Sequence, residues 1–283
     1  MRGAELFEPA LFRMSMAEVR ATDPSHRVLL EDVYSAVVRS GHSRSSLLGT
    51  GTGMLLGIAN VADWGQLQRD RTGGTAGGVH GAHGSDGGAA AGRVSYLFGL
   101  KGPCFSVNTA CSSSLVALDA GCQNLRLGTC GRSVVAGVAL QLHGSSFAAF
   151  CALHALSVDG QCKTFDSRAD GYGRSEGCGA MLLEHMHKRE SAAAVLGSAT
   201  NQDGRSASLM APNGPSQQQV IRAALTVAEV QSISLVETHG TGTALGDPIE
   251  VGALSCVLGA SASHLWPAVL GAIKSQVAHS EGA

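Results

Sequence analysis

The sequence between residues 105 and 125 constrains the fold most strongly, because an extended apolar run gives way there to a helix. Phe105 and Val107 belong to a run of β-forming residues that stops at a cluster of small side chains. Helical periodicity follows, with apolar residues spaced 3, 4 and 3 apart, at Leu115, Leu118, Cys122 and Leu125. This pattern predicts a strand-to-helix corner of an α/β protein, with Cys111 on the first turn of the helix.

That position would make Cys111 a candidate nucleophile. The positive end of a helix dipole favours thiolate over thiol by about 0.3–1 kcal/mol, which assists the nucleophile without fully activating it. The small side chains of Ala110 and Ser112 would let the backbone turn sharply, as at the nucleophile elbow of acyl-transfer enzymes. The alternative interpretation is a buried structural residue, as free cysteines usually are.

Two later apolar runs also end at chemically active residues. The run 234–237 is followed by His239, and the run 269–273 by Lys274 and then His279. In α/β sheets, ligands bind at the carboxyl ends of the strands. A cysteine, two histidines and a lysine at three such ends therefore predict one active site.

The helices and strands predicted in the rest of the chain also indicate an α/β protein. We predict a helix that begins at Asp23-Pro24 and ends at Gly41, and another that begins with Asp247 as its N-cap. Residues 72–92, mostly Gly, Ala, His and Ser, predict a long flexible loop. Further predicted elements are strands within 48–58 and at 133–140, 179–183 and 193–199, and a helix at 216–228.

Composition excludes several classes of function. The net charge of -2 gives no basic field for nucleic acid, and no apolar run approaches the ~18 residues that cross a membrane. The eight cysteines form no C-x-x-C pair, and residues 1–20 carry charges throughout, unlike a signal peptide. We therefore expect free thiols and a cytoplasmic location. His80 and His83 lack a third ligand nearby, so no metal site is predicted.

Three motifs carry a resemblance to a known family. They are Asn108-Thr109-Ala110-Cys111-Ser112-Ser113-Ser114-Leu115, His239-Gly240-Thr241-Gly242-Thr243, and Lys274 with His279-Ser280-Glu281-Gly282-Ala283. Supporting matches include Gly92-Arg93-Val94-Ser95-Tyr96 and Gly246-Asp247-Pro248-Ile249-Glu250. In this order, over nearly the whole chain, they resemble the β-ketoacyl synthases, and most closely the ketosynthase domain of type I polyketide synthases.

The resemblance implies an α/β, thiolase-like fold in five layers, α-β-α-β-α, here expected to be incomplete at both ends because the chain is partial. Residues 1–160 would form the N-terminal half with the nucleophilic cysteine. Residues 161–283 would begin the C-terminal half with the two histidines. A homodimer is implied, with acyl carrier protein as the partner. The substrate would be carried on phosphopantetheine, and no metal or redox cofactor would be required.

The resemblance also assigns roles to single residues. Cys111 would accept an acyl chain, and His239 and His279 would assist decarboxylation of a malonyl-type extender. Two neutral imidazole N–H groups can stabilise the resulting enolate without adding a repelling charge. Lys274 would support His279 and the charge balance of the site. Thr241 and Thr243 would hydrogen-bond the pantetheine arm. The overall reaction is a decarboxylative Claisen condensation in polyketide or fatty acid biosynthesis.

The sequence departs from the family at a few positions and leaves two alternatives open. Gln276 and Ala278 replace the usual Asn and Gly near His279, and Asn108 stands where Asp is common. The first alternative is a truncated, inactive ketosynthase fragment that acts only in dimerisation or carrier-protein binding. The second is a Cys–His hydrolase, which the paired histidines and the Gly-Thr loop disfavour.

Overall fold

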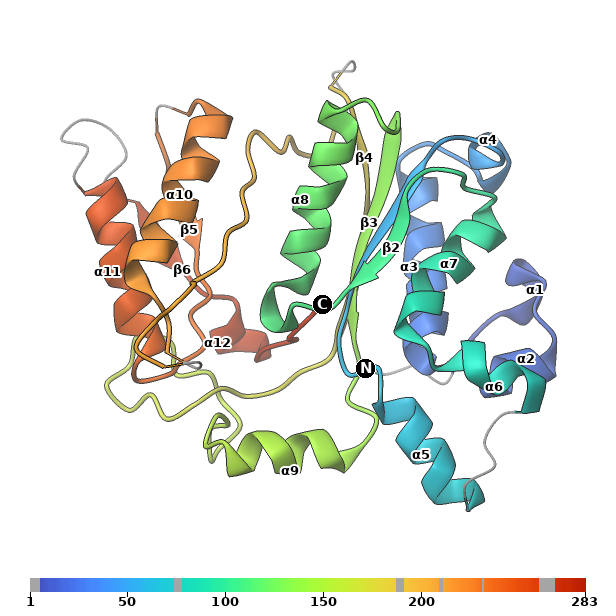
Figure 1. The fold of residues 1–283 in the computed structure, drawn as a ribbon, viewed down its shortest axis with the longest axis horizontal. Helices are drawn as coiled ribbons and strands as arrows, with labels where there is room; N and C mark the ends of the chain where they lie inside the picture. The colour runs from blue at the N-terminus through green and yellow to red at the C-terminus, as the bar shows by residue number, and fades with distance from the viewer. Residues whose placement is uncertain (1–5, 74–77, 187–190, 209–210, 231, 260–267) are drawn as a thin grey trace. The chain divides into compact units, whose positions relative to one another are not determined.

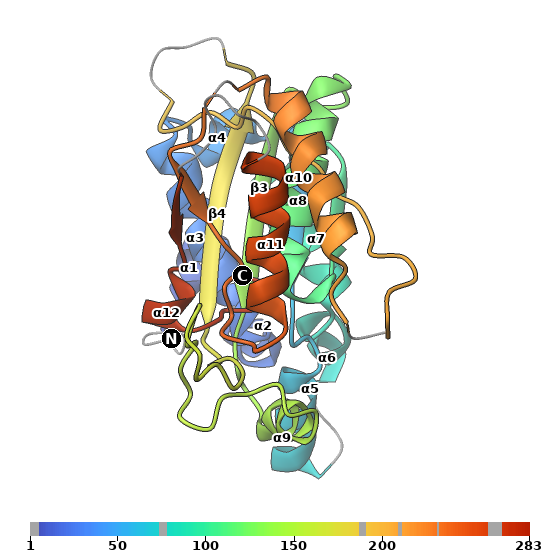
Figure 2. The ribbon, with the colours of Figure 1, turned by 90° about the vertical axis from the view of Figure 1, so that its left-hand side faces the viewer.

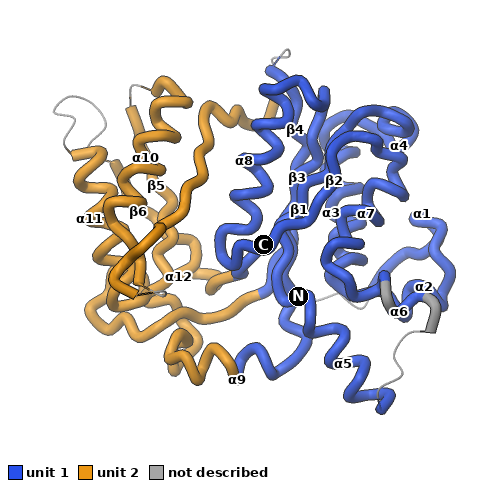
Figure 3. Tube along the Cα trace, viewed as in Figure 1, with its two compact units in different colours: residues 1–148, 176–187, 280–283 blue, residues 149–175, 188–279 orange. Residues whose placement is uncertain are grey.

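The computed structural model divides the chain into two compact units, each described by itself below. The structure describes residues 6–73, 78–186, 191–208, 211–230, 232–259 and 268–283. Unit 1 comprises residues 1–148, 176–187 and 280–283, and unit 2 comprises residues 149–175 and 188–279 (Figure 3). None of the described helices is both long enough and apolar enough to cross a membrane.

Unit 1 is built on a four-stranded sheet with the order β2-β1-β3-β4. Its strands are β1 (Gly53–Ile58), β2 (Cys104–Val107), β3 (Arg132–Ala139) and β4 (Gly177–Glu184). The pairings of β1 with β2 and with β3 are parallel, whereas β3 and β4 pair in antiparallel fashion, side by side in Figure 2. Every residue of β1 is buried, as expected of a central parallel strand. The predicted strands within 48–58 and at 133–140 and 179–183 are thus confirmed.

Helices cover both faces of this sheet (Figure 1). On one face, α3 (Pro24–Arg39) and α7 (Gly87–Phe98) pack over alternate strand residues such as Leu56 and Val134. On the other face, α8 (Ser113–Arg126) packs Ala117 against Leu55 and Val135. The alternation follows from the two-residue period of a strand. The remaining helices that start in unit 1 are α1 (Pro9–Phe12), α2 (Met16–Ala21), α4 (Arg44–Leu47), α5 (Asp63–Thr72), α6 (Gly78–Gly84) and α9 (Gly144–Ala152).

The prediction of a loop at residues 72–92 is wrong, although residues 74–77 lie outside the described part. Helices α6 and α7 occupy most of this stretch. The carboxylate of Asp86 caps α7 by accepting hydrogen bonds from the backbone N–H groups of Gly88 and Ala89. Ala90, Ala91 and Val94 are then buried in the core of unit 1. Capping and burial therefore outweigh the low helix propensity of the glycines.

Unit 2 contains a two-stranded parallel sheet, β5 (Leu235–Glu237) and β6 (Val269–Gly271). Its helices are α10 (Gly214–Ala228), α11 (Gly246–Leu258) and α12 (Lys274–Val277). Leu254, Val257 and Leu258 of α11 form its apolar cluster with partly buried side chains from α10 and both strands. The predicted helix at 216–228 is confirmed. The predicted strand at 193–199 is wrong, because these residues pair with no strand among the described residues.

Candidate active site

Cys111 lies at the corner between β2 and α8, in a short 3-10 turn, Ala110–Ser112, that directly precedes α8. The predicted strand-to-helix corner is therefore confirmed, but the residue sits just before the helix rather than on its first turn. Ala110 has a left-handed backbone with φ of 55°, an uncommon conformation for a residue with a Cβ. The Cys111 side chain is exposed, unlike that of a core cysteine.

Short polar side chains hold this corner in place. Ser113 Oγ donates to the carbonyl of Ala110 at 2.7 Å and accepts from the backbone N–H of Thr109 at 2.9 Å. The amide oxygen of Asn108 accepts from the backbone N–H of Ala110 at 3.0 Å. The turn around Cys111 is thus cross-linked from both sides by side chains of the same motif.

Two glycines of the sheet allow the start of α8 to lie close to the strands. Gly57 of β1 and Gly137 of β3 are paired in register. A Cβ at Gly57 would lie 2.5 Å from the carbonyl carbon of Ser113, and one at Gly137 would lie 2.8 Å from the Cβ of Ser114. The predicted apolar face of α8 is confirmed only in part. Cys122 and Leu125 are buried together with Ala117 and Gly121, but Leu115 is 66% exposed.

In unit 2, His239 follows β5 and begins a loop whose backbone is held by hydrogen bonds to side chains. Glu250 of α11 accepts hydrogen bonds from the backbone N–H groups of His239 at 2.6 Å and Gly240 at 2.9 Å. Asp247, which is buried, accepts from the N–H of Gly242 at 3.1 Å and from that of Phe165 at 2.9 Å. Two carboxylates from the first two turns of α11 therefore fix the backbone that carries His239.

The prediction that Asp247 is the N-cap of its helix is wrong. Helix α11 begins at Gly246 with Leu245 at the N-cap position, so Asp247 lies inside the helix. Its carboxylate binds the preceding loop instead of capping its own helix. The same loop requires glycine at Gly242, which has φ of 78° and would place a Cβ 2.5 Å from the backbone nitrogen of Lys163.

His279 is buried and is held by its own backbone. Its N–H donates to the carbonyl of Gly173 at 2.8 Å, and its carbonyl accepts from the N–H of Ser175 at 2.9 Å. The preceding residue, Ala278, has φ of 60° and ψ of -172°. This region of backbone space is occupied almost only by glycine, so the residue is strained. The bonds at Gly173 and Ser175 keep His279 in place despite that strain.

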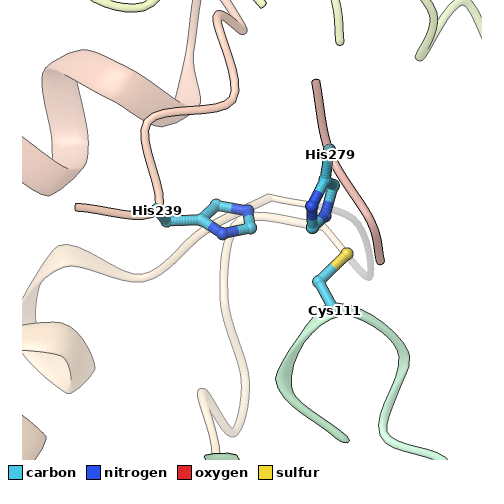
Figure 4. A group of neighbouring side chains, drawn as sticks. All are labelled: Cys111, His239 and His279. Atoms are coloured by element: carbon cyan, nitrogen blue, oxygen red, sulfur yellow. The ribbon is translucent and has the colours of Figure 1, made fainter. Parts of the chain in front are cut away.

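The rings of His239 and His279 lie beside one another, with centroids 5.4 Å apart and planes at 89°. Figure 4 draws them together with Cys111, which belongs to unit 1. Loss of water around His239, and then the positive charge of Lys274, lower the pKa of its imidazole below the ordinary value. A neutral imidazole is therefore favoured at neutral pH, as an N–H donor to an anion requires.

The structure places the other predicted site residues as follows. Lys274 is half-buried at the start of α12. Thr241 is buried, and the hydroxyl of Thr243 accepts from the N–H of Gly246 at 3.2 Å. The sequence analysis did not identify Asp247 and Glu250 as the side chains that bind backbone N–H groups of the loop with His239. Their spacing of three residues, directly after the Gly-Thr loop, is a signal that could have indicated them.

Comparison with known proteins assigns the chain to a family. The profile of the "Beta-ketoacyl synthase, N-terminal domain" matches residues 1–189, and that of the C-terminal domain matches residues 192–283. The chain belongs to the β-ketoacyl synthase family.

Its relatives are much longer polyketide synthases. It is 41% identical to the mycoketide-CoA synthase of Mycobacterium tuberculosis over 99% of this chain and 7% of that protein. The erythronolide synthase EryA3 of Saccharopolyspora erythraea is 40% identical over 98% of this chain and 9% of its own length.

Solved ketosynthase structures share its fold. The ketosynthase from module 6 of the bacillaene synthase of Bacillus subtilis 168 matches with a TM-score of 0.89 and 33% identity, over 100% of this chain and 50% of that one. The oxazolomycin ketosynthase domain OzmH KS7 of Streptomyces albus JA3453 matches with a TM-score of 0.86 and 32% identity, over 98% of this chain and 48% of that one. The β-ketoacyl synthase described here thus has the thiolase-like fold and spans about half the length of the solved chains.

Proposed function

We propose that this β-ketoacyl synthase chain is an acyltransferase that carries out a decarboxylative Claisen condensation. It would join an acyl group on Cys111 to a malonyl-type extender held on acyl carrier protein, in polyketide or fatty acid biosynthesis. The observation that carries the proposal is the pair of imidazoles, His239 and His279, with ring centroids 5.4 Å apart. Membership of the ketosynthase family supports it.

The first step loads the acyl group. The thiolate of Cys111 attacks the acyl thioester, an acyl–sulfur bond forms at Cys111, and the bond to the carrier's sulfur breaks. The carrier thiolate leaves and takes up a proton. The exposed side chain of Cys111 on a tightly cross-linked corner suits this attack, because the thiol is accessible and its backbone is held in one conformation.

The second step forms the carbon–carbon bond. The extender loses carbon dioxide, and the electron pair of the broken bond becomes an enolate on the thioester. N–H groups of His239 and His279 donate to the enolate oxygen, and each such donor is typically worth about 10²–10³ in rate. The enolate carbon then attacks the acyl–Cys111 carbonyl, and the thiolate of Cys111 leaves. The electrons balance without a redox partner or metal.

Contacts within unit 1 support bringing Cys111 and His279 to one thioester. A Cβ at Gly137 would lie 2.8 Å from the Cβ of Ser114 and 3.0 Å from the carbonyl carbon of Ala283. Ser114 follows Cys111 by three residues, and Ala283 follows His279 by four. Four extended residues span at most about 14 Å. The chain itself therefore limits how far His279 can lie from the corner of Cys111.

The proposal also includes the partners and the remaining site residues. Thr241 and Thr243 would bind the phosphopantetheine arm of acyl carrier protein, and Lys274 would keep His239 neutral and support His279. No further cofactor is part of the proposal. The proposal also divides the chain into two halves: residues 1–160 supply the nucleophile, and residues 161–283 supply the two histidines.

A homodimer is the proposed assembly, and the edge strand β2 of unit 1 supports it. Strand β2 ends the order β2-β1-β3-β4, and its residue Phe105 is 41% exposed. An apolar edge strand with free backbone groups is a template for pairing, and a two-fold axis would place it opposite its own copy. Phe105→Glu should yield monomers by light scattering, and an unchanged mass would contradict pairing at this edge.

Acyl labelling tests the proposed nucleophile. The chain is incubated with a short acyl N-acetylcysteamine thioester, digested and analysed by mass spectrometry. We expect one acyl group on Cys111, lost in Cys111→Ala and kept in Cys256→Ala, which removes another exposed cysteine. Equal labelling of the other cysteines, or none at Cys111, would overturn the proposal. Release of the free acid without retention on Cys111 would indicate a hydrolase instead.

A further inference from the structure

Three polar side chains of unit 1 form a chain of hydrogen bonds away from the cysteine site. The Nε2 atom of His143 lies 2.9 Å from Oδ2 of Asp70, and its Nδ1 atom lies 2.7 Å from Oγ of Ser145. The Asp–His–Ser order matches that of a hydrolytic triad, in which a carboxylate orients an imidazole that activates a hydroxyl. All three residues belong to unit 1, the unit drawn in blue in Figure 3.

The charge of Asp70 sets the tautomer of His143. The hydrogen bond from His143 holds the pKa of the Asp70 carboxyl below its ordinary value, so the carboxylate is ionised at neutral pH. An ionised carboxylate only accepts, so Nε2 of His143 carries the proton. Nδ1 then keeps its lone pair, which accepts from Oγ of Ser145 and also from the Ser145 backbone N–H at 3.1 Å.

Helix α5 fixes His143 at two points. Asp63, the first residue of α5, accepts hydrogen bonds from the backbone N–H groups of Leu142 and His143, each at 3.2 Å. Asp70, seven residues later on the same helix, holds the ring. Backbone and side chain of His143 are thus oriented by one rigid element, which is what a general base needs.

Ser145 is placed where a nucleophile can react. It is exposed and lies on the first turn of α9, whose positive end favours an anionic oxygen. The Ser146 hydroxyl, one residue later, donates to the carbonyl of His143 at 3.2 Å. Ser146 therefore provides a matched control.

The geometry points to Asp70, His143 and Ser145 as a second nucleophilic site, which accepts acyl groups from esters or thioesters. Oγ of Ser145 attacks the acyl carbonyl, and its proton passes to Nδ1 of His143. The bond to the leaving group breaks, and that group takes the proton from His143. Water then attacks the acyl–serine ester with His143 again as base, which releases the acid and restores the serine. This activity is separate from condensation at Cys111.

A fluorophosphonate probe tests this site in a Cys111→Ala background, which removes the proposed thiol nucleophile. We expect a covalent adduct on Ser145, located by peptide mass spectrometry, and hydrolysis of p-nitrophenyl acetate above the solvent rate. Ser145→Ala should abolish both, whereas Ser146→Ala should leave both unchanged. His143→Gln should lower both rates about 100-fold or more, as expected for loss of a general base.

The outcomes separate catalysis from a purely structural role. If His143 only caps α9, no adduct forms on Ser145 and the three variants hydrolyse the ester equally, which would overturn the inference. Added imidazole should restore labelling in His143→Gly, a rescue that a structural role would not show. Circular dichroism of each variant confirms that α9 and the rest of the fold are retained.

Discussion

The carboxylate of Glu250 accepts a hydrogen bond from the backbone N–H of His239 at 2.6 Å, and the neighbouring N–H of Gly240 binds the same group at 2.9 Å. Helix α11 therefore holds in place the backbone that carries the imidazole of His239. In Glu250→Gln, one of the two acceptor oxygens is replaced by an NH2 group, which cannot accept a hydrogen bond. Decarboxylation of a malonyl thioester should fall up to about 100-fold, because small misplacements of a catalytic group are costly.

Acyl loading of Cys111 provides the control for Glu250→Gln. It should proceed at the parental rate, because His239 does not take part in that step. Glu229→Gln, a change of the same kind at an exposed position, should affect neither reaction. Equal loss of loading and decarboxylation in Glu250→Gln would indicate general misfolding and contradict the assigned role.

Lys274 should set part of the pH dependence of decarboxylation. Burial, and then the positive charge of Lys274, lower the pKa of His239. Lys274→Met removes the repulsion between the lysine and the protonated imidazole, so the pKa of His239 rises. The acidic limb of the rate profile should move to higher pH, with a larger loss of rate at pH 6 than at pH 8. An acidic limb at the parental position would show that Lys274 does not act on this imidazole.

Ala278 should be a site where glycine stabilises the protein. Its φ of 60° and ψ of -172° cost about 1–3 kcal/mol for a residue with a Cβ, more than the roughly 0.5–1 kcal/mol that glycine loses in entropy. Ala278→Gly should therefore raise the melting temperature, by about 2–4 °C for each kcal/mol gained. In contrast, Ala223→Gly, at an exposed position within α10, should lower it. A lower melting temperature in Ala278→Gly would contradict the strained backbone.

Asp23 should make the stability of the protein depend on pH. Burial raises the pKa of this carboxyl to about 6 from its ordinary value of 3.8. Between these values the folded protein keeps a proton that the unfolded chain has lost, so the free energy of unfolding falls as pH rises. The full effect is about 3 kcal/mol.

Asp23→Asn retains the oxygen that caps α3 but does not titrate. Its advantage in unfolding free energy over the parent should therefore grow between pH 4 and pH 7. His26 contributes an opposite dependence in both proteins, because burial lowers its pKa to about 4, and this contribution cancels in the difference. A constant difference in urea titrations would show that Asp23 does not titrate as described.

Most strands of unit 1 could be predicted from the sequence, because their apolar runs are bounded by turn residues. Burial of all of β1 and most of β3 is consistent with the continuous apolar runs seen in the sequence. Helices α6 and α7 could not be predicted, because their glycines and alanines carry little periodic signal. Their stability depends on contacts between distant segments, such as Val94 in the core that contains Leu30 and Leu56.

The reactive residues of the candidate site were easier to predict than the contacts that hold them in place. Cys111, His239 and His279 could be chosen because each follows a strand and bears a reactive group. The clamp on His279 involves backbone atoms of Gly173 and Ser175, more than a hundred residues earlier, and leaves no pattern in side-chain types. The Asp70–His143 contact likewise joins residues 73 apart, which only the fold brings together.

The most direct test of the account is the release of carbon dioxide from a malonyl thioester by the acyl-loaded protein. The parent should release carbon dioxide and form the condensed product. His239→Asn and His279→Asn should each load the acyl group normally but release carbon dioxide about 10²- to 10³-fold more slowly. If both variants release carbon dioxide at the parental rate, the two imidazoles do not stabilise the enolate, and the proposed mechanism is wrong.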